Sequence, residues 1–211
     1  MRVEINPIEF VALVKHYFTN NDIKNIIEIG SLNAKDAIFF KEQFPNANVY
    51  CIEALPENYD AYIKNNTQII PINTVITNYN GKTIFHRKKI NGIHSILNRG
   101  NQYGTDKIEL ACQTLDTLCN TYNITSPDMI KIDTEGTTYE VLQGAKTVLP
   151  NVKILHIETE SYQFFENQYL HEDVADFLLH NNFILLDMTS ACILDNYKQH
   201  DSVWLNRKYK K

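Results

Sequence analysis

Short apolar runs alternate with amphipathic segments along most of this sequence. Each run has the length of one buried strand, and the runs read "NIIEIG", "NVYCIE", "QIIPI", "DMIKID", "VKILHIE", "FILLDM" and "DSVWLN". Strands that alternate with helices predict an α/β fold whose sheet is mostly parallel. No helical pattern separates the last two runs, so we expect the last strand to be antiparallel.

Local signals predict several helix starts and turns. The segment Asn6–Glu9 has a capping Asn, a Pro at the first helical position and a Glu at the third, which predicts a helical lead-in within residues 1–25. Thr137–Glu140 has the spacing of a capping box. Asn80-Gly81 lies between β-rich runs and predicts a tight hairpin. The glycines and polar residues of 90–106 predict a mobile lid over the bound ligands.

The composition is that of a globular domain with an excess of acids. The chain has 211 residues, 44% of them apolar and 21% charged, so a single domain over residues 1–211 is expected. A formal net charge of −5 disfavours nucleic acid as a partner, because phosphate binding needs a basic surface. Neither a cysteine framework, a signal peptide nor a membrane-spanning run is found, which predicts a cytoplasmic protein. The oligomeric state has no signature in the sequence.

Two landmarks follow the first two predicted strands, at the edge where open α/β sheets bind their ligands. Gly30 directly follows the first strand, and a glycine there lets a ligand approach the backbone. Glu53 ends the next strand, where a carboxylate can accept hydrogen bonds from the hydroxyls of a ribose. Either residue alone is more simply a turn glycine or a surface acid. Together, in this order and spacing, they predict a nucleoside site.

The glycine loop narrows the choice of nucleoside. It reads G-S-L-N-A-K, with one glycine where a dinucleotide site has three to cradle its pyrophosphate. A ligand with a ribose but without phosphate fits better. S-adenosylmethionine (SAM) is such a ligand, and its amino-acid part needs backbone groups and an acid.

Several segments together resemble those of the FkbM-type SAM-dependent methyltransferases. In chain order they are "IIEIGSLNAKDA", "VYCIEALPENY", "TLDTL", "MIKIDTEGTTYEVLQGA" and "ILHIE". The resemblance implies a class I methyltransferase fold, which is Rossmann-like, with a seven-stranded, mostly parallel sheet, an antiparallel last strand and helices on both faces. It also implies methyl transfer to oxygen, commonly on hydroxyls of sugars or small metabolites. A further glycine is usual near the position of Ala34, so this chain departs from the pattern there.

The candidate cofactor-binding residues lie at the two strand ends. They are Glu28, Gly30, Ser31, Asn33, Glu53 and Ala54. We expect the ribose of SAM at Glu53 and its amino-acid end near Glu28, Gly30 and Ser31.

The segment "KIDTEG" places Lys131, Asp133 and Glu135 on and just after a predicted buried strand. Burying charges is costly unless they are paired or used. One interpretation is a structural ion pair between Lys131 and Asp133. A second is that the acids accept the hydroxyl proton of the acceptor, with Lys131 keeping them ionised. A third is that Asp133 and Glu135 hold a divalent cation such as Mg²⁺ or Mn²⁺.

Other candidates lie outside this motif. His94, in the glycine-containing segment, is a surface histidine or else a general base or substrate contact over the pocket. Glu158 ends a strand near the same pocket, and Tyr103 and Tyr162 could stack on a sugar. The candidate catalytic residues are thus Asp133, Glu135, Lys131 and His94.

The leading hypothesis is a SAM-dependent O-methyltransferase acting on a small-molecule or glycan hydroxyl. A metal-dependent sugar transferase would use Asp133 and Glu135 to hold a nucleotide sugar. A methyltransferase fold that has lost activity and binds a partner is suggested by the missing second glycine. A nicotinamide oxidoreductase fits least well, because the pyrophosphate loop is absent.

Overall fold

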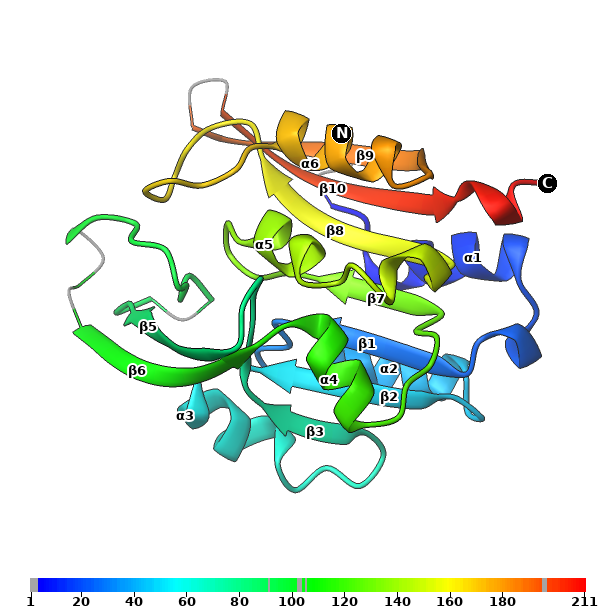
Figure 1. Cartoon of the computed structure of the whole chain (residues 1–211), viewed down its shortest axis with the longest axis horizontal. Helices are drawn as coiled ribbons and strands as arrows, with labels where there is room; N and C mark the ends of the chain where they lie inside the picture. Colours follow the sequence, from blue (N-terminus) through cyan, green and yellow to red (C-terminus); the bar gives the residue numbers. More distant parts are fainter. Residues whose placement is uncertain (1–3, 91, 102–103, 105, 195–196) are drawn as a thin grey trace.

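Two sheets form the framework of the protein (Figure 1). The structure is a computed structural model, and it describes residues 4–90, 92–101, 104, 106–194 and 197–211. The larger sheet has seven strands in the order β3-β2-β1-β7-β8-β10-β9. These strands are β1 (Asn25–Ile29), β2 (Asn48–Glu53), β3 (Ile70–Asn73), β7 (Met129–Ile132), β8 (Ile154–Glu160), β9 (Phe183–Leu194) and β10 (Tyr197–Asn206).

The direction of the strands agrees with the predicted α/β fold. The pairings among β3, β2, β1, β7 and β8 are all parallel, whereas β10 runs antiparallel to both β8 and β9. The antiparallel last strand is therefore confirmed. β10 lies between β8 and β9 although it follows both in the chain, and its Trp204 is only 2% exposed.

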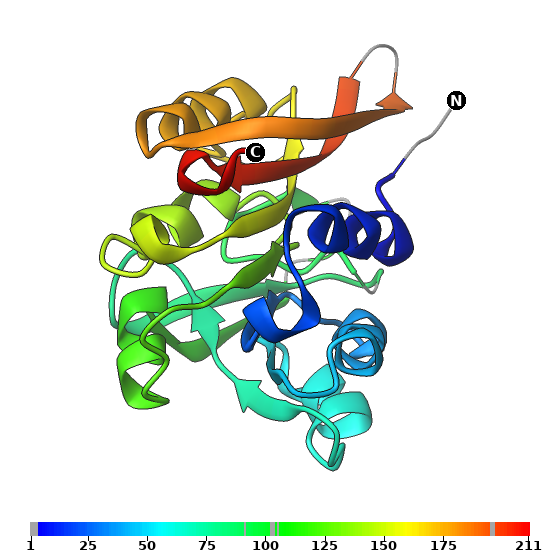
Figure 2. The same cartoon turned by 90° about the vertical axis from the view of Figure 1, so that its right-hand side faces the viewer.

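Helices cover both faces of the large sheet, as Figure 2 shows. They are α1 (Pro7–Tyr17), α2 (Lys35–Gln43), α3 (Pro56–Asn58) with its continuation Tyr59–Ile63, α4 (Leu115–Thr121), α5 (Thr138–Gln143) and α6 (His171–His180), with short turns at Asn20–Asp22, Leu149–Asn151 and Arg207–Tyr209. The apolar residues of α1 and α2 share one buried cluster, and those of α4, α5 and α6 share another. The sheet between the clusters is thus buried on both sides, as a parallel sheet requires.

The two predicted capping boxes had different outcomes. At α1 the Asn6 side chain accepts the amides of Ile8 and Glu9, and the Glu9 carboxylate accepts the Asn6 amide, so this box is confirmed. The box at α5 is wrong. The Thr137 hydroxyl instead donates to the Thr134 carbonyl oxygen at 2.9 Å, because the preceding turn brings that acceptor within reach.

The predicted hairpin at Asn80-Gly81 is wrong, because the two strands that it joins are not paired with each other in the small sheet. Its strands are β4 (Val75–Ile76), β5 (Gly81–Arg87) and β6 (Asp106–Gln113), in the order β4-β6-β5. β6 is a strand that the sequence analysis did not predict, and it lies between the two strands that Asn80-Gly81 was expected to join. The Asn80 side chain accepts the Thr114 amide at 2.9 Å, which holds the link against the end of β6.

The connection from β5 to β6 contains the predicted lid. Within its described residues, the chain folds back so that Ser95 pairs with His86 of β5. Tyr103 lies outside the described residues, and the opening and closing of the segment stays a prediction.

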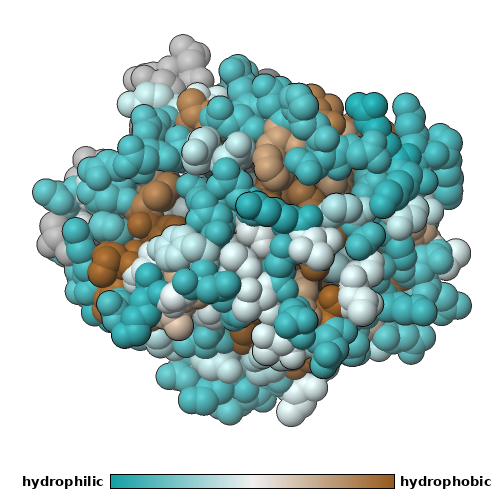
Figure 3. All heavy atoms as spheres, viewed as in Figure 1, coloured by the Kyte–Doolittle hydropathy of each residue, from teal (hydrophilic) through white to brown (hydrophobic). Residues whose placement is uncertain are grey.

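The molecular face in Figure 3 is mostly hydrophilic, with hydrophobic side chains in separate patches. None of the helices within the described ranges has both the length and the apolar character needed to cross a membrane.

Candidate active site

A cavity of about 260 Å³ lies where the carboxyl ends of β1, β2, β7 and β8 meet the small sheet. Gly30, Glu53, Ala54, Asp133 and Glu135 all border it, so two distant parts of the sequence meet at one site. Glu28, Ser31 and Asn33 do not border it. They lie in or behind the turn that carries Gly30.

Gly30 allows the ends of β1 and β7 to pack closely. Its φ is +85°, and an added Cβ would lie 1.8 Å from the carbonyl oxygen of Asp133. No side chain fits at that distance. The amides of Gly30 and Ser31 also donate to the Ile52 carbonyl oxygen at 3.0 and 3.1 Å, which joins the turn to β2. The glycine is therefore required by strand packing as well as by access to the cavity.

Glu28 and Ser31 form a buried pair behind that turn. The Ser31 hydroxyl donates to Glu28 Oε2 at 2.5 Å, and the thiol of Cys51 lies 3.0 Å from the same hydroxyl. Burial raises the pKa of Glu28 to about 7, although the Lys131 ammonium and the Ser31 hydroxyl oppose the rise. This pair is placed to support the turn rather than to touch a ligand in the cavity.

Asn33 and Ala34 lead into helix α2. The Asn33 side chain accepts the Lys35 amide at 3.2 Å. Ala34 is buried and has a φ of +61°, a left-handed conformation that glycine adopts with less strain. The chain thus keeps the backbone shape for which the resembling family usually has a glycine, at an expected cost of about 1 kcal/mol.

Glu53 is fixed at the end of β2 by backbone amides. Its Oε2 accepts the Leu32 amide and its Oε1 accepts the Leu55 amide, each at 2.8 Å. Burial raises its pKa, and the hydrogen bonds from Leu55, Leu32 and Asn58 oppose the rise. A carboxylate has about four lone-pair sites, and these three hydrogen bonds leave one with which Glu53 can accept a hydrogen bond from a ligand in the cavity.

Lys131 has a closer partner than the predicted Asp133. Its ammonium lies 2.5 Å from Asp36 Oδ2 in α2 and 3.5 Å from Asp133 Oδ2. Burial disfavours the charged form, but the carboxylates of Asp133, Glu28 and Asp36 outweigh it and raise the pKa of Lys131. Lys131 therefore stays charged and links α2 to the acids beyond β7.

Three carboxylates converge on one side of the cavity. Oxygen atoms of Asp133, Glu135 and Glu158 all lie within 4.8 Å of one another. Glu158 Oε1 is buried and has no hydrogen-bond partner within the described part of the chain. Burial, reinforced by the charges of Asp133 and Glu160, raises the pKa of Glu135 to about 8.

Two residues that the sequence analysis did not single out complete this acidic side. Arg99, from the connection between β5 and β6, places Nη1 3.5 Å from Glu135 Oε2. Glu160 is buried at the end of β8, and its Oε2 accepts the Gln168 side-chain amide at 2.5 Å. Burial raises the pKa of Glu160 to about 7, against the influence of Arg99. Strand alternation places Glu158 and Glu160 on one face and could have identified Glu160, whereas no local pattern identifies Arg99.

His94 lies in the part of the predicted lid that borders the cavity. Its Nδ1 accepts the Lys88 amide at 2.9 Å, so the proton of the neutral ring is on Nε2. Burial lowers the pKa of His94. The neighbouring Ser95 hydroxyl donates to the Glu135 carbonyl oxygen at 2.7 Å, which joins the lid directly to the acidic turn.

Comparison with known proteins gives consistent matches to methyltransferases. The family described as "Methyltransferase FkbM domain" matches residues 20–185. The hexuronic acid methyltransferase AglP of Haloferax volcanii is 26% identical over 120 residues, which cover 53% of this chain and 47% of AglP. The 2-O-methyltransferase NoeI of Sinorhizobium fredii is 23% identical over 173 residues, which cover 72% of this chain and 70% of NoeI. The chain thus spans about half the length of AglP.

Solved structures share the fold at low sequence identity. An O-methyltransferase from Bacillus cereus, in complex with SAH, matches with a TM-score of 0.52 at 13% identity. The match covers 97% of this chain and 84% of the Bacillus chain. M. capricolum TrmK, in complex with S-adenosyl-homocysteine, has a TM-score of 0.51 at 12% identity and covers 96% and 70%. The seven-stranded sheet is therefore that of the class I SAM-dependent methyltransferases.

Proposed function

This chain belongs to the FkbM methyltransferase family, and we propose that it transfers the methyl group of SAM to a hydroxyl of a sugar or other small acceptor. One observation carries the proposal: a single cavity is bordered by Glu53 at one strand end and by Asp133, Glu135 and Glu158 at two others. The two curated relatives are named for methylation of a hexuronic acid and for 2-O-methylation, which supports a sugar as acceptor.

The residues present suit SAM. Glu53 would hold the ribose, because it borders the cavity and its carboxylate has a lone pair left to accept a hydrogen bond. Gly30 and Ala54 would contact the ligand from the same side, while Glu28, Ser31 and Asn33 keep their turn in shape. When bound, SAM supplies a methyl group activated by a sulfonium, which is the difficult part of the chemistry.

The acids would serve the acceptor. A hydroxyl must lose its proton as it attacks, and a carboxylate within reach can accept it. We assign this role first to Asp133, which follows the rigid strand β7 and lies 3.5 Å from the Lys131 ammonium. When no cation is bound, the raised pKa of Glu135 favours a protonated carboxyl, which can donate a hydrogen bond to the acceptor.

His94 would contact the ligands from the connection between β5 and β6, where it borders the cavity. Its Nδ1 lone pair accepts the Lys88 amide, so the neutral ring has no nitrogen lone pair left to take a proton from the acceptor. We therefore assign it the role of substrate contact rather than of general base.

We also propose that the acidic side binds a divalent cation. Asp133, Glu135 and Glu158 supply oxygen ligands that suit Mg²⁺ or Mn²⁺, and the unpartnered Glu158 Oε1 supports this use. Titration of Mn²⁺ into the protein should then give saturable binding that Glu158→Gln weakens at least about tenfold, since a charged ligand is lost. Activity should disappear with EDTA and return with Mg²⁺ or Mn²⁺. Full activity in EDTA would contradict the proposal.

The ligand specificity separates the proposed function from its alternatives. Calorimetric titration should show binding of SAM, and of neither NAD nor a UDP-sugar. A sugar transferase would bind the UDP-sugar, and an oxidoreductase would bind NAD. An inactive partner-binding domain would show no methyl transfer to any acceptor.

Glu53 gives the sharpest test of where SAM binds. Glu53→Ala should weaken SAM affinity at least about tenfold, because a hydrogen bond to a charged group contributes roughly 1.5–3 kcal/mol. Glu57→Ala removes a nearby exposed acid and serves as the matched control. Both titrations are run well below the melting temperature of the variants, since Glu53 also holds two backbone amides. Equal affinity of the two variants would refute the assignment.

A further inference from the structure

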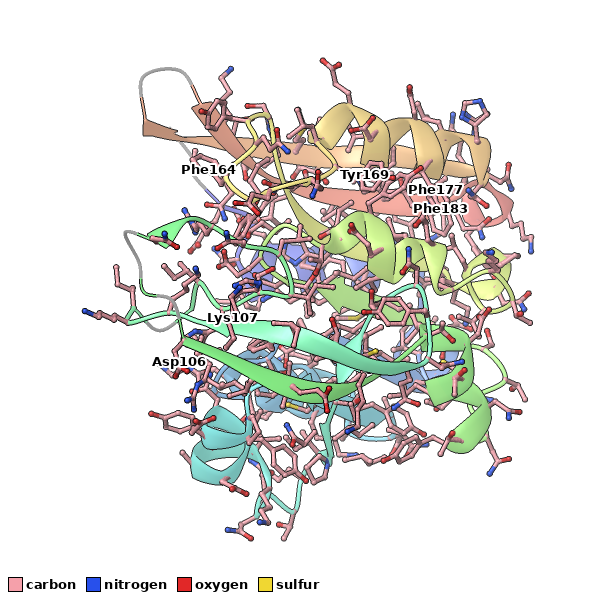
Figure 4. The ribbon with its side chains drawn as sticks, turned by 60° about the vertical axis from the view of Figure 1, so that its left-hand side comes forward. Asp106, Lys107, Phe164, Tyr169, Phe177 and Phe183 are labelled. Atoms are coloured by element: carbon pink, nitrogen blue, oxygen red, sulfur yellow. The ribbon has the colours of Figure 1, made fainter. Side chains whose placement is uncertain are left out.

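The loop after β8 is rich in aromatic residues, which separate into two groups. Tyr169 stacks on Tyr139 with ring centroids 4.0 Å apart and lies near Phe177 and Phe183 beside α6 (Figure 4). Phe164 lies apart from that group, nearer the start of the loop. Its ring meets the ring of Tyr162 edge to face at 5.3 Å.

The second group consists of Tyr162, Phe164 and Phe165, and it is fixed against the acidic side of the cavity. Phe165 is 2% exposed and packs on the turn after Asp133, because a Cβ on Gly136 would lie 2.6 Å from its ring. The side-chain oxygen of Gln168 accepts the amides of Phe164 and Phe165, and the Gln168 side-chain amide donates to Glu160. The loop is therefore held in one position relative to the carboxylates.

Arg99 connects this aromatic group to the acids. Its guanidinium carbon lies 5.3 Å from the ring centre of Phe164 and 5.1 Å from that of Phe165, and its Nη1 lies 3.5 Å from Glu135. The neighbouring Asn98 bonds Glu166 through both main chain and side chain. A continuous path of contacts thus runs from Glu135 through Arg99 and Phe164 to Tyr162, which is 41% exposed.

We propose that Tyr162, Phe164 and Arg99 form a platform that binds the pyranose ring of a sugar acceptor beside the acids. The inference rests on the proposed function and names the acceptor class and the residue that selects it. A pyranose has an apolar C–H face and a rim of hydroxyls. Tyr162 offers an exposed ring for the face, and Arg99 and the carboxylates offer donors and acceptors for the rim.

The platform also accounts for the composition of this surface. A flat aromatic ring gives contact area at a small entropic cost, because only two side-chain torsions have to be fixed. The edge-to-face contact with Phe164 restrains the Tyr162 ring further. The Tyr162 and Phe164 rings would therefore be in place before the acceptor binds.

The test uses methyl α-glucopyranoside, methyl α-galactopyranoside, methyl α-mannopyranoside and glucuronic acid as probes. Saturation-transfer NMR with the protein saturated with S-adenosylhomocysteine should show binding of at least one of them, strongest at its C–H protons. Tyr162→Ala should weaken that binding by about tenfold, and Tyr162→Phe by no more than about twofold, because the ring carries the contact. Tyr62→Ala removes a ring that is 54% exposed elsewhere and should change nothing.

Two results would overturn the platform. One is that none of the four probes binds the wild-type protein, and the other is that Tyr162→Ala binds them as well as wild type does. Failure of the proposed function is recognised separately, because wild-type protein would then fail to bind SAM in calorimetry. Every Tyr162 variant should keep wild-type SAM affinity, and loss of that affinity would count against a role confined to the acceptor.

Discussion

Asp133→Asn and Glu135→Gln are expected to lower the turnover of methyl transfer by roughly 10²–10⁴-fold, the usual contribution of a general acid or base. Both substitutions keep the size of the side chain and remove its ability to gain and lose a proton. The SAM contacts proposed above are Glu53, Gly30 and Ala54, so SAM affinity should stay close to that of wild type in both variants. Turnover, SAM affinity and thermal melting are measured on the same preparations. Glu109→Gln, which changes an exposed acid of β6, is the matched control.

The melting curves distinguish chemistry from scaffolding. If these acids only anchor the turn, the variants should melt well below wild type and keep their specific activity when folded. For Glu135 the pH dependence gives an independent check. Its folded-state pKa of about 8 lies above the ordinary value of 4.5, so the folded protein binds this proton more tightly than the unfolded chain. The contribution of this proton to the stability of the wild type is therefore lost as pH rises from about 4.5 to about 8. Over the same rise in pH, the stability of Glu135→Gln should increase relative to that of the wild type.

Gly30→Ala is expected to cause the largest loss of stability of any single change at this site. The added Cβ meets the backbone oxygen of Asp133 at 1.8 Å, which no rotamer can relieve, and the φ of +85° is unfavourable for alanine. Together the overpacking and the backbone strain predict a loss of roughly 3–5 kcal/mol in the free energy of unfolding. Urea unfolding of the purified variant measures it. Such a loss is a large part of the stability of a typical domain, so poor expression is expected as well.

Gly100→Ala is the matched control for this prediction. Gly100 has a similar φ of +89°, and among the described residues nothing lies within 4 Å of a Cβ added there. It should lose only the cost of the left-handed conformation, about 1–2 kcal/mol. Similar losses in the two variants would show that the close approach of β1 and β7 contributes little.

Features that depend only on residues close together in the sequence could be predicted from it. Buried strands show as apolar runs, and the order of Gly30 and Glu53 follows from the strands that carry them. Lys131 and Asp133 were predicted as a pair because they share a strand face, but the closer partner is Asp36, which the fold brings from α2. The pattern of residues within one strand does not show which residue of a helix, such as Asp36, will pack against it.

The errors in the small sheet have the same origin. Asn80-Gly81 is a strong local hairpin signal, and it was overridden because β6 takes the place between β4 and β5. The position of Arg99 beside Glu135 likewise depends on how the connection from β5 to β6 folds back. Local signals predict the elements well, whereas their partners are decided by long-range packing.

The place of β10 determines when the sheet can be completed as the chain is made. Within the described residues β8 pairs with β7 and not with β9, so β9 can join the sheet only when β10, which follows both, has been synthesised. The gap beside β8 therefore stays open, and β9 stays without a strand neighbour, until β10 has been made. Trp204, the only tryptophan, is in the strand that fills the gap. The fluorescence of Trp204 therefore reports when β10 inserts between β8 and β9 during folding.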